Sequence, residues 1–393
     1  MKRLIALLAL LSTLLVITAC NDKKNNIKPP HALSEITASV PVEELWNARI
    51  GRGAHHSGVR MRPAVADGRV YAASIDGEIA AFDAATGRTL WRQQRQWRDT
   101  GDRGYSGGPS VLGDALAIGT RDGKLLLLNA TTGAQQWEAK LGSSIISAPV
   151  FADGLVLART EDGNITALKQ TDGSRAWRYD RGIVPALSLR GNGGLTVRQG
   201  VVFFGSDDGK LVAIRLDNGS PLWEHVAASG EGRTEIQQLA DADGTPLVQG
   251  TTVYLGGYQG DLIAVEGPTG RPLWSHPFST YSGLASGGTS LIGVDAESNV
   301  WAFDDSTGSD LWKQDGLSWR WLSAPAIMGS YVVVGDAAGY VHWLDLADGK
   351  FVARMRPSHD AIRAQPVVID ANTVIVEDSQ GGITAFRVGT TKS

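Results

Sequence analysis

The chain has 393 residues and a formal net charge of −4, so no strong basic field points to nucleic-acid binding. Hydrophobic residues make up 42% of it, which allows a sizeable core, and its 48 glycines are spread along the chain, which indicates many turns. The length permits one large repeat fold or two ordinary domains.

Residues 1–19 are predicted to be a signal peptide that is removed. Lys2 and Arg3 precede a mostly apolar run of 16 residues, which is shorter than the span of about 20 residues that a membrane helix needs. The run ends in VITAC, which resembles the lipobox of bacterial lipoproteins. That resemblance implies that Cys20 becomes the first mature residue and is lipidated. The alternative is an ordinary signal peptide with an incidental cysteine.

Residues 20–40 are predicted to be the lipidated cysteine and a flexible tether. The sequence NDKKNNIKPPHALSE is polar and charged and contains a proline pair. In the best-studied enterobacteria, an Asp directly after the cysteine retains a lipoprotein in the inner membrane. Asn21 stands at that position here, with Asp22 one residue later, so we expect a lipid anchor at the periplasmic face of the outer membrane.

Residues 41–393 carry a repeat. The sequence TGRTLW at 86–91 recurs with a glycine four residues before a tryptophan, as TGAQQW, DGSRAW, NGSPLW, TGRPLW and TGSDLW. Ten residues before each of these glycines lies a second turn, usually ending in Gly, although Ser298 takes that place in one unit. An Asp-Gly pair between alternating apolar residues is a strong hairpin signal.

One unit shows what the repeat builds. Strands are expected at 147–152, 155–160, 164–170 and 175–180, which makes four antiparallel strands in about 35 residues. Four strands per period of about 40 residues are typical of a β-propeller blade. Seven units show both turns, and the eighth is split between residues 381–388 and 42–46. The prediction is an all-β, eight-bladed β-propeller of four-stranded antiparallel blades, closed by the N-terminal strand.

The repeated tryptophans are expected to dock on the neighbouring blade. They are Trp46, Trp91, Trp137, Trp177, Trp223, Trp274 and Trp312. After Gly349 the equivalent position is Ala353, so that contact is expected to be weaker, or to be filled by Trp343 or Phe351. Over roughly residues 42–388, the pattern resembles the tryptophan-docking motif of the quinoprotein (PQQ-like) propeller superfamily.

No candidate catalytic residue, cofactor or metal site emerges from the sequence. Quinoprotein alcohol dehydrogenases hold pyrroloquinoline quinone with Ca²⁺ and typically use an adjacent cysteine pair, whereas Cys20 is the only cysteine here. GYSGG at 104–108 matches G-x-S-x-G, but strands are expected after it, so a loop is predicted in place of a nucleophile elbow. The adjacent His55 and His56 are assigned to a surface loop.

Two stretches depart from the repeat, at residues 184–200 and 230–250. The first contains Leu187, Leu189 and Arg190, and the second contains Asp241 and Asp243, which would share a face if extended. One interpretation is longer loops with ordinary inner strands. The other is a docking surface, because loops on rigid scaffolds tend to carry function.

The run ALSLRG, together with the lipobox, the tether and the propeller, is similar to the BamB family, the lipoproteins of the machinery that inserts β-barrel proteins into the bacterial outer membrane. In that family a Leu-Ser-Leu-Arg and an Asp-x-Asp segment contact the periplasmic domains of BamA. The matching positions are Leu187, Leu189, Arg190, Asp241 and Asp243. The resemblance implies a non-enzymatic scaffold that also presents edges or loops to unfolded barrel precursors. The alternatives are a quinoprotein-like periplasmic enzyme and a ligand-binding propeller.

Overall fold

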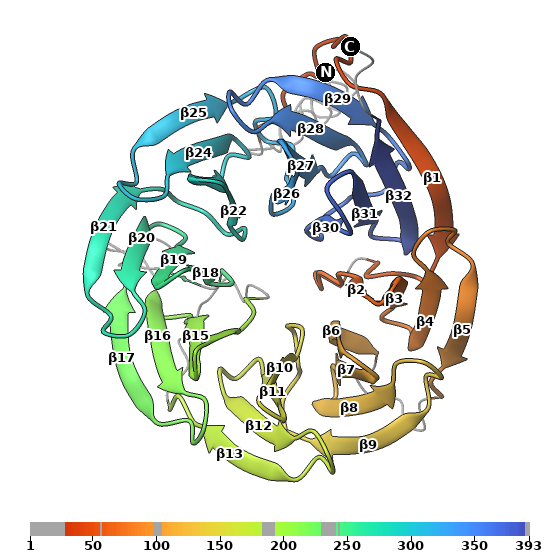
Figure 1. Ribbon diagram of the computed structural model, residues 1–393, viewed down its shortest axis with the longest axis vertical. Helices are drawn as coiled ribbons and strands as arrows, with labels where there is room; N and C mark the ends of the chain where they lie inside the picture. Colours follow the sequence, from red (N-terminus) through yellow and green to blue (C-terminus); the bar gives the residue numbers. More distant parts are fainter. Residues whose placement is uncertain are drawn as a thin grey trace, which may run out of the picture.

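The computed structural model describes residues 28–55, 57–96, 104–182, 193–228, 241–242 and 244–389. Its strands form eight four-stranded antiparallel sheets arranged as the blades of a ring (Figure 1). The arrangement confirms the predicted eight-bladed propeller.

Blades one to seven each use four consecutive strands, from the inner to the outer edge of the ring. Blade one contains β2 (Ala64–Ala66), β3 (Arg69–Ala73), β4 (Glu78–Asp83) and β5 (Thr89–Gln94). Blade two contains β6 (Tyr105–Leu112), β7 (Ala115–Thr120), β8 (Lys124–Asn129) and β9 (Gln135–Lys140). Blade three contains β10 (Val150–Ala152), β11 (Leu155–Arg159), β12 (Ile165–Lys169) and β13 (Arg175–Tyr179). Blade four contains β14 (Thr196–Arg198), β15 (Val201–Gly205), β16 (Lys210–Arg215) and β17 (Pro221–Val226).

The next three blades repeat this order. Blade five contains β18 (Leu247–Gln249), β19 (Thr252–Gly256), β20 (Asp261–Glu266) and β21 (Pro272–Pro277). Blade six contains β22 (Ala285–Gly287), β23 (Ser290–Val294), β24 (Val300–Asp304) and β25 (Asp310–Gln314). Blade seven contains β26 (Ala326–Met328), β27 (Tyr331–Gly335), β28 (Val341–Asp345) and β29 (Phe351–Met355).

Blade eight joins the two ends of the chain. Its inner strands are β30 (Val367–Val368), β31 (Thr373–Glu377) and β32 (Gly382–Val388), and its outer strand is β1 (Val42–Arg49). β1 runs antiparallel to β32, with Val42 opposite Val388 and Arg49 opposite Gly382. The N-terminal strand therefore closes the ring, as predicted, and leaves no open sheet edge between the first and last blades (Figure 1).

The seven repeated tryptophans share one geometry. Each indole N–H donates a hydrogen bond of 2.8–3.1 Å to a backbone carbonyl of the next blade, three residues before that blade's motif glycine. Each indole ring also lies against that glycine. At Gly219, for example, an added Cβ would come within 2.5 Å of the ring of Trp177. The motif glycine thus makes the turn and leaves room for the neighbouring tryptophan.

The hairpin of blade six accommodates Ser298 in place of glycine. Ser298 has a positive φ of 70°, the left-handed conformation that glycine adopts at the equivalent turns. The carboxylate of Asp295 accepts backbone N–H bonds from Glu297 at 2.9 Å and from Asn299 at 2.8 Å. These side-chain hydrogen bonds stabilise the turn.

The prediction of a loop at residues 104–108 is wrong, because the structure places Tyr105–Leu112 in strand β6. The pairing of β6 with β7 shifts register between Tyr105 and Gly107 and again between Gly107 and Ser110. These bulges allow a glycine-rich segment to join a sheet. The hydroxyl of Ser106 is buried and donates to the carbonyl of Ile145 at 2.7 Å, so it is engaged in the fold.

From residue 28 onward, the segment predicted as a tether lies against the ring. The N–H of His31 donates to the carbonyl of Ser318 at 2.9 Å, and the N–H of Ser39 donates to the carbonyl of Val352 at 2.9 Å. Leu33 packs against the apolar cluster between blades six and seven. In the part of the chain that the structure describes, no helix is long and apolar enough to cross a membrane.

Candidate partner-binding face

The ring has two faces with different kinds of loop. In an antiparallel blade, the hairpin between the second and third strands lies at the same end as the segment that leads to the next blade. We term this side the connection face. The two stretches that depart from the repeat are connections of this kind, between blades three and four and between blades four and five.

Of the residues predicted to bind a partner, the structure describes Asp241. Leu187, Leu189, Arg190 and Asp243 lie outside the described residues, as does the predicted lipidation site, Cys20. Asp241 is only 2% exposed. Its carbonyl accepts the N–H of Tyr258 at 2.6 Å, and its own N–H points to the carbonyl of Tyr258 at 3.5 Å. The backbone of the second connection is thus fixed to the hairpin of blade five.

That hairpin differs from its neighbours. In blades three and four, Thr160 and Ser206 each donate a hydroxyl hydrogen bond of 2.5 Å to an aspartate two residues later. Blade five has Gly257 at this position, and an added Cβ there would lie 2.8 Å from the Cβ of Ala228. The sequence GGYQG therefore marks a close approach of two backbone segments, and the paired glycines are the signal that could have indicated it.

The two connections lie side by side. The N–H of Gly194 donates to the hydroxyl of Thr245 at 2.8 Å, and the hydroxyl of Thr196 donates to the carbonyl of Pro246 at 2.6 Å. The N–H of Ala242 also donates to the carbonyl of Ser206 at 3.2 Å. The second connection therefore packs over blade four, where the first connection ends.

A buried ionic network supports both ends of the segment 183–192. Arg159 pairs with Asp207 at 3.2 Å and also donates to the carbonyl of Gly193 at 3.3 Å. Arg181 pairs with Asp207 at 3.6 Å and with Asp208 at 2.5 Å. Buried charges are costly unless they are paired, so this cluster favours one geometry for the residues flanking the segment.

A second buried cluster lies within blade seven. Asp336 accepts from Arg320 at 2.7 Å and lies 3.1 Å from Nε2 of His342, whose Nδ1 accepts from Arg354 at 3.2 Å. Burial raises the pKa of Asp336, but the hydrogen bonds that it accepts from His342, the backbone of Tyr340 and Arg320 lower it, and the net effect is a lowered pKa. Burial lowers the pKa of His342 despite the attraction of Asp336. The geometry matches a neutral His342 with its proton on Nε2.

The described ranges contain no group of three or more His, Cys, Asp or Glu side chains that could hold a metal ion. His55 is tied to the ring, since its N–H donates to the carbonyl of Ser379 at 2.6 Å and its Nδ1 lies 3.3 Å from Oε1 of Gln380. His56 lies outside the described residues.

Comparison with known proteins agrees with this architecture. The family described as outer membrane protein assembly factor BamB matches residues 41–99, 94–314 and 307–392. The chain belongs to the BamB family. A relative from Xanthomonas campestris with that name is 39% identical over 91% of this chain and 89% of its own length. Another BamB, from Burkholderia pseudomallei, is 35% identical over 98% of this chain and 99% of its own length.

Solved structures separate the family from the wider fold. BamB from Moraxella catarrhalis superposes with a TM-score of 0.79 at 28% identity, covering 88% of this chain and 100% of that one. A quinohemoprotein alcohol dehydrogenase from Comamonas testosteroni reaches a TM-score of 0.70 at 15% identity, covering 90% of this chain and 77% of that one. The second likeness shows the fold alone. The relatives in the BamB family are named as assembly factors, so the chain falls with them and not with the enzymes.

Proposed function

We propose that the chain is a lipid-anchored scaffold of the outer-membrane protein assembly complex and binds the periplasmic domains of BamA through its connection face. Membership of the BamB family supports the complex. The observation that carries the choice of surface is the set of hydrogen bonds joining Gly194 and Thr196 to Thr245 and Pro246. These bonds bring together the two connections that contain every partner-binding residue predicted from the sequence.

Within that surface we assign different roles to the predicted residues. Leu187 and Leu189 are proposed as apolar anchors, because interface energy concentrates in a few buried side chains. Arg190 and Asp243 are proposed to set the register of docking by charge. Asp241 is buried and its backbone is paired with Tyr258, so we assign it to positioning the second connection.

The proposed lipid anchor would lie on the same face. Lys28 lies 4.4 Å from the ring centroid of Trp319 and 3.7 Å from the carboxylate of Glu297, both in connection-face segments of blade six and its exit. Seven residues lie between Cys20 and Lys28, and the eight steps from one to the other span at most about 29 Å when extended. A lipidated Cys20 would therefore hold the connection face close to the periplasmic surface of the outer membrane.

Affinity purification of the full-length protein from detergent-solubilised membranes tests the proposal. We expect BamA to be recovered with it, and unfolded barrel precursors to be recovered after cross-linking. A Cys20→Ser variant should move to the soluble fraction. Recovery without BamA would contradict the proposed partner, and a Cys20→Ser variant that stays on BamA-depleted membranes in high salt would contradict the anchor.

A further inference from the structure

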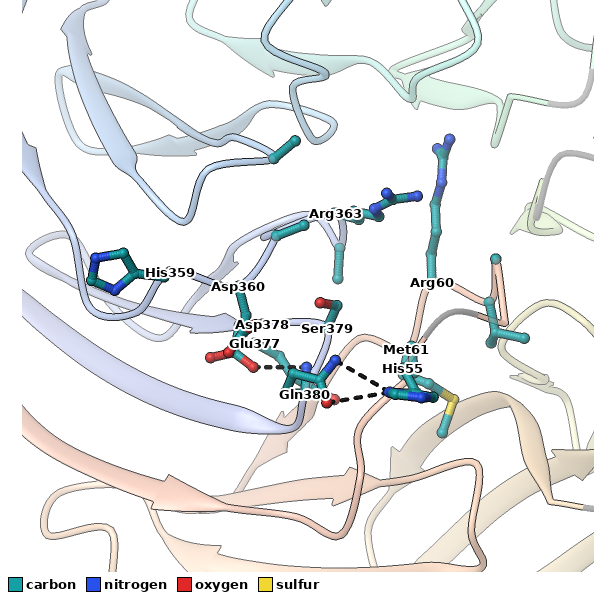
Figure 2. A pocket seen from close by; sticks show the side chains of 16 residues that line it. His55, Arg60, Met61, His359, Asp360, Arg363, Glu377, Asp378, Ser379 and Gln380 are labelled. Atoms are coloured by element: carbon teal, nitrogen blue, oxygen red, sulfur yellow. Dashed lines mark hydrogen bonds between the residues drawn. The ribbon is translucent and has the colours of Figure 1, made fainter.

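A cavity of about 360 Å³ opens on the connection face at the centre of the ring. We term it the central cavity. Its walls come from the connection between blades eight and one, the connection between blades seven and eight, and the hairpin of blade eight (Figure 2). It shares no residue with the two connections proposed to bind BamA.

Two arginines extend into this space from different connections. Arg60 follows blade eight and Arg363 follows blade seven, and Figure 2 shows both side chains extending to the same side of the cavity. The guanidinium of Arg60 reaches the connection between blades five and six, where it donates to the carbonyl of Tyr281 at 3.5 Å and lies 5.9 Å from that ring's centroid. Arg62, two residues on along an extended stretch, is also exposed, whereas the intervening Met61 is buried.

These positive charges form no ion pair with a carboxylate of the described residues. Of the ion pairs among the described residues, none includes Arg60, Arg62 or Arg363, while most other buried or half-buried arginines on this face are paired. Arg60 is exposed overall, and its guanidinium group lies beside the ring of Tyr281. Burial lowers its pKa, Tyr281 opposes that effect, and the like charge of Arg363 lowers the pKa further. Two mutually repelling cations in a partly desolvated space favour an anion between them.

The acidic groups that line the central cavity do not supply this charge. Asp378 accepts the backbone N–H groups of Gln380 and Gly382, both at 2.9 Å. Asp360 and His359 lie toward the other end of the cavity, away from the two guanidinium groups (Figure 2). Glu377 is only 4% exposed, and burial together with the neighbouring charge of Asp378 raises its pKa well above the usual range, which favours its uncharged form.

The packing of blade eight gives the buried carboxyl group of Glu377 no polar contact among the described residues. Both its carboxyl oxygens are buried without a hydrogen-bond partner in the part of the chain that the structure describes. Glu377 pairs with Ile383, and the residues at the equivalent register position in strands β7, β15 and β27 are glycines, namely Gly119, Gly205 and Gly335. A buried carboxyl group without a partner costs free energy, so its presence at the wall of the cavity indicates a polar ligand.

We propose that the central cavity binds an oxyanion, a phosphoryl or carboxylate group, between the guanidinium groups of Arg60 and Arg363. Guanidinium groups bind both kinds of anion through paired N–H donors, and such charge-assisted bonds are the stronger ones. An uncharged Glu377 can donate an O–H bond to a further polar group of the ligand. The cavity volume suits a small molecule or an anionic end group. This site is independent of the proposed function in barrel assembly.

Isothermal titration of the full-length protein in a chloride buffer tests the site. Inorganic phosphate and citrate are titrated separately, so that phosphoryl and carboxylate binding are distinguished. We expect saturable binding of at least one of them. Arg60→Gln and Arg363→Gln should each weaken that binding about tenfold or more, because each removes a charged hydrogen-bond donor.

Arg52→Gln is the matched control. Arg52 is an exposed arginine of the same connection as Arg60 but does not line the central cavity, so its loss should change the affinity by less than about twofold. If Arg60→Gln lowers the melting temperature through the lost contact with Tyr281, the anion affinity of Arg363→Gln alone tests the proposal. Binding of neither anion, or equal binding by Arg363→Gln and Arg52→Gln, would overturn the proposal.

Discussion

Seven of the eight junctions between blades are built alike, and the junction between blades seven and eight is built differently. At the seven, a tryptophan from one outer strand lies on the glycine of the next blade's last turn and donates its N–H to a carbonyl there. Blade eight has no such turn, because its outer strand β1 and its neighbour β32 come from opposite ends of the chain. The turn between the third and fourth strands of a blade therefore forms the docking site for the tryptophan. Blade eight lacks this turn and so lacks the docking site.

The eighth junction is filled from an inner strand. Trp343 on β28 lies opposite Ala353, is fully buried, and meets the ring of Phe386 in blade eight edge-on, with centroids 5.6 Å apart. Its N–H has no hydrogen-bond partner among the described residues, unlike the indoles of the seven docked tryptophans. Val40 of the N-terminal segment completes this apolar cluster. Phe351, the other candidate, instead packs toward blade six.

The largest effect is expected from removing the strand that closes the ring. Deleting residues 21–46 should cost about 5 kcal/mol or more of unfolding free energy, because it exposes the edges of two strands and empties the pocket of Trp46. Deleting residues 21–38 leaves β1 in place and should cost less, chiefly the contacts of residues 28–38 with blade seven. Equal denaturation midpoints for the two variants would contradict the closing role of β1.

Substitutions of the two kinds of tryptophan sharpen the comparison. Trp343→Ala should cost about 3–5 kcal/mol, as expected for a large buried side chain. Trp177→Phe loses the 2.8 Å bond to the carbonyl of Leu216, whereas Trp343→Phe loses no hydrogen bond among the described residues. Urea denaturation should therefore show Trp177→Phe to be the more destabilising by about 1–2 kcal/mol. The opposite order would show that the two junctions do not differ in this way.

A pair of glycines isolates the docking contact itself. Gly219 has φ +72° and lies against Trp177, whereas Gly154 has φ +74° and nothing within 4 Å of an added Cβ. Alanine at Gly154 should cost about 1–2 kcal/mol from backbone strain alone. Alanine at Gly219 should cost about 1–3 kcal/mol more, because the methyl group overlaps the indole. If the two alanine variants lose the same stability in thermal unfolding, the indole of Trp177 moves aside without a measurable cost.

The smallest expected effect concerns His342, which neighbours Trp343 but points to the other side of blade seven. Its pKa is lowered in the folded state, so the unfolded chain takes up a proton first as the pH falls below about 6.5. The stability that depends on a neutral His342 is thus present above this pH and lost below it, by at most about 2 kcal/mol between pH 7 and pH 5.

A His342→Gln variant should show a smaller loss of stability over that range, measured by denaturation at each pH. The lowered pKa of Asp336 acts in a more acidic window, since its contribution is lost only as the pH falls below about 3.8, the ordinary value. An unchanged slope between pH 7 and pH 5 in the variant would show that His342 is not the titrating group.

The blades could be predicted from the sequence because their signals are local. The motif glycine and tryptophan of one repeat, such as Gly219 and Trp223, lie four residues apart, and the two strands of each hairpin follow one another along the chain. Trp343 could be named from the sequence as a candidate for the eighth junction, but its contact with Phe386 could not. The central cavity could not be predicted, because it depends on pairs such as Arg60 and Tyr281, which are 221 residues apart. The spacing of Asp241 and Asp243 indicated a shared face but could not show that Asp241 is buried.

The central claim is that the ring supplies rigidity and the connections between blades three, four and five supply the partner contact. The direct measurement is a pull-down of purified BamA periplasmic domains by a Leu187→Ala, Leu189→Ala, Arg190→Ala triple variant, paired with its thermal melt. We predict that binding weakens at least about tenfold while the melting temperature stays at the wild-type value, since truncated anchors cost about 1–3 kcal/mol each. Full binding by the triple variant, or lost binding together with a collapsed melting temperature, would contradict this account.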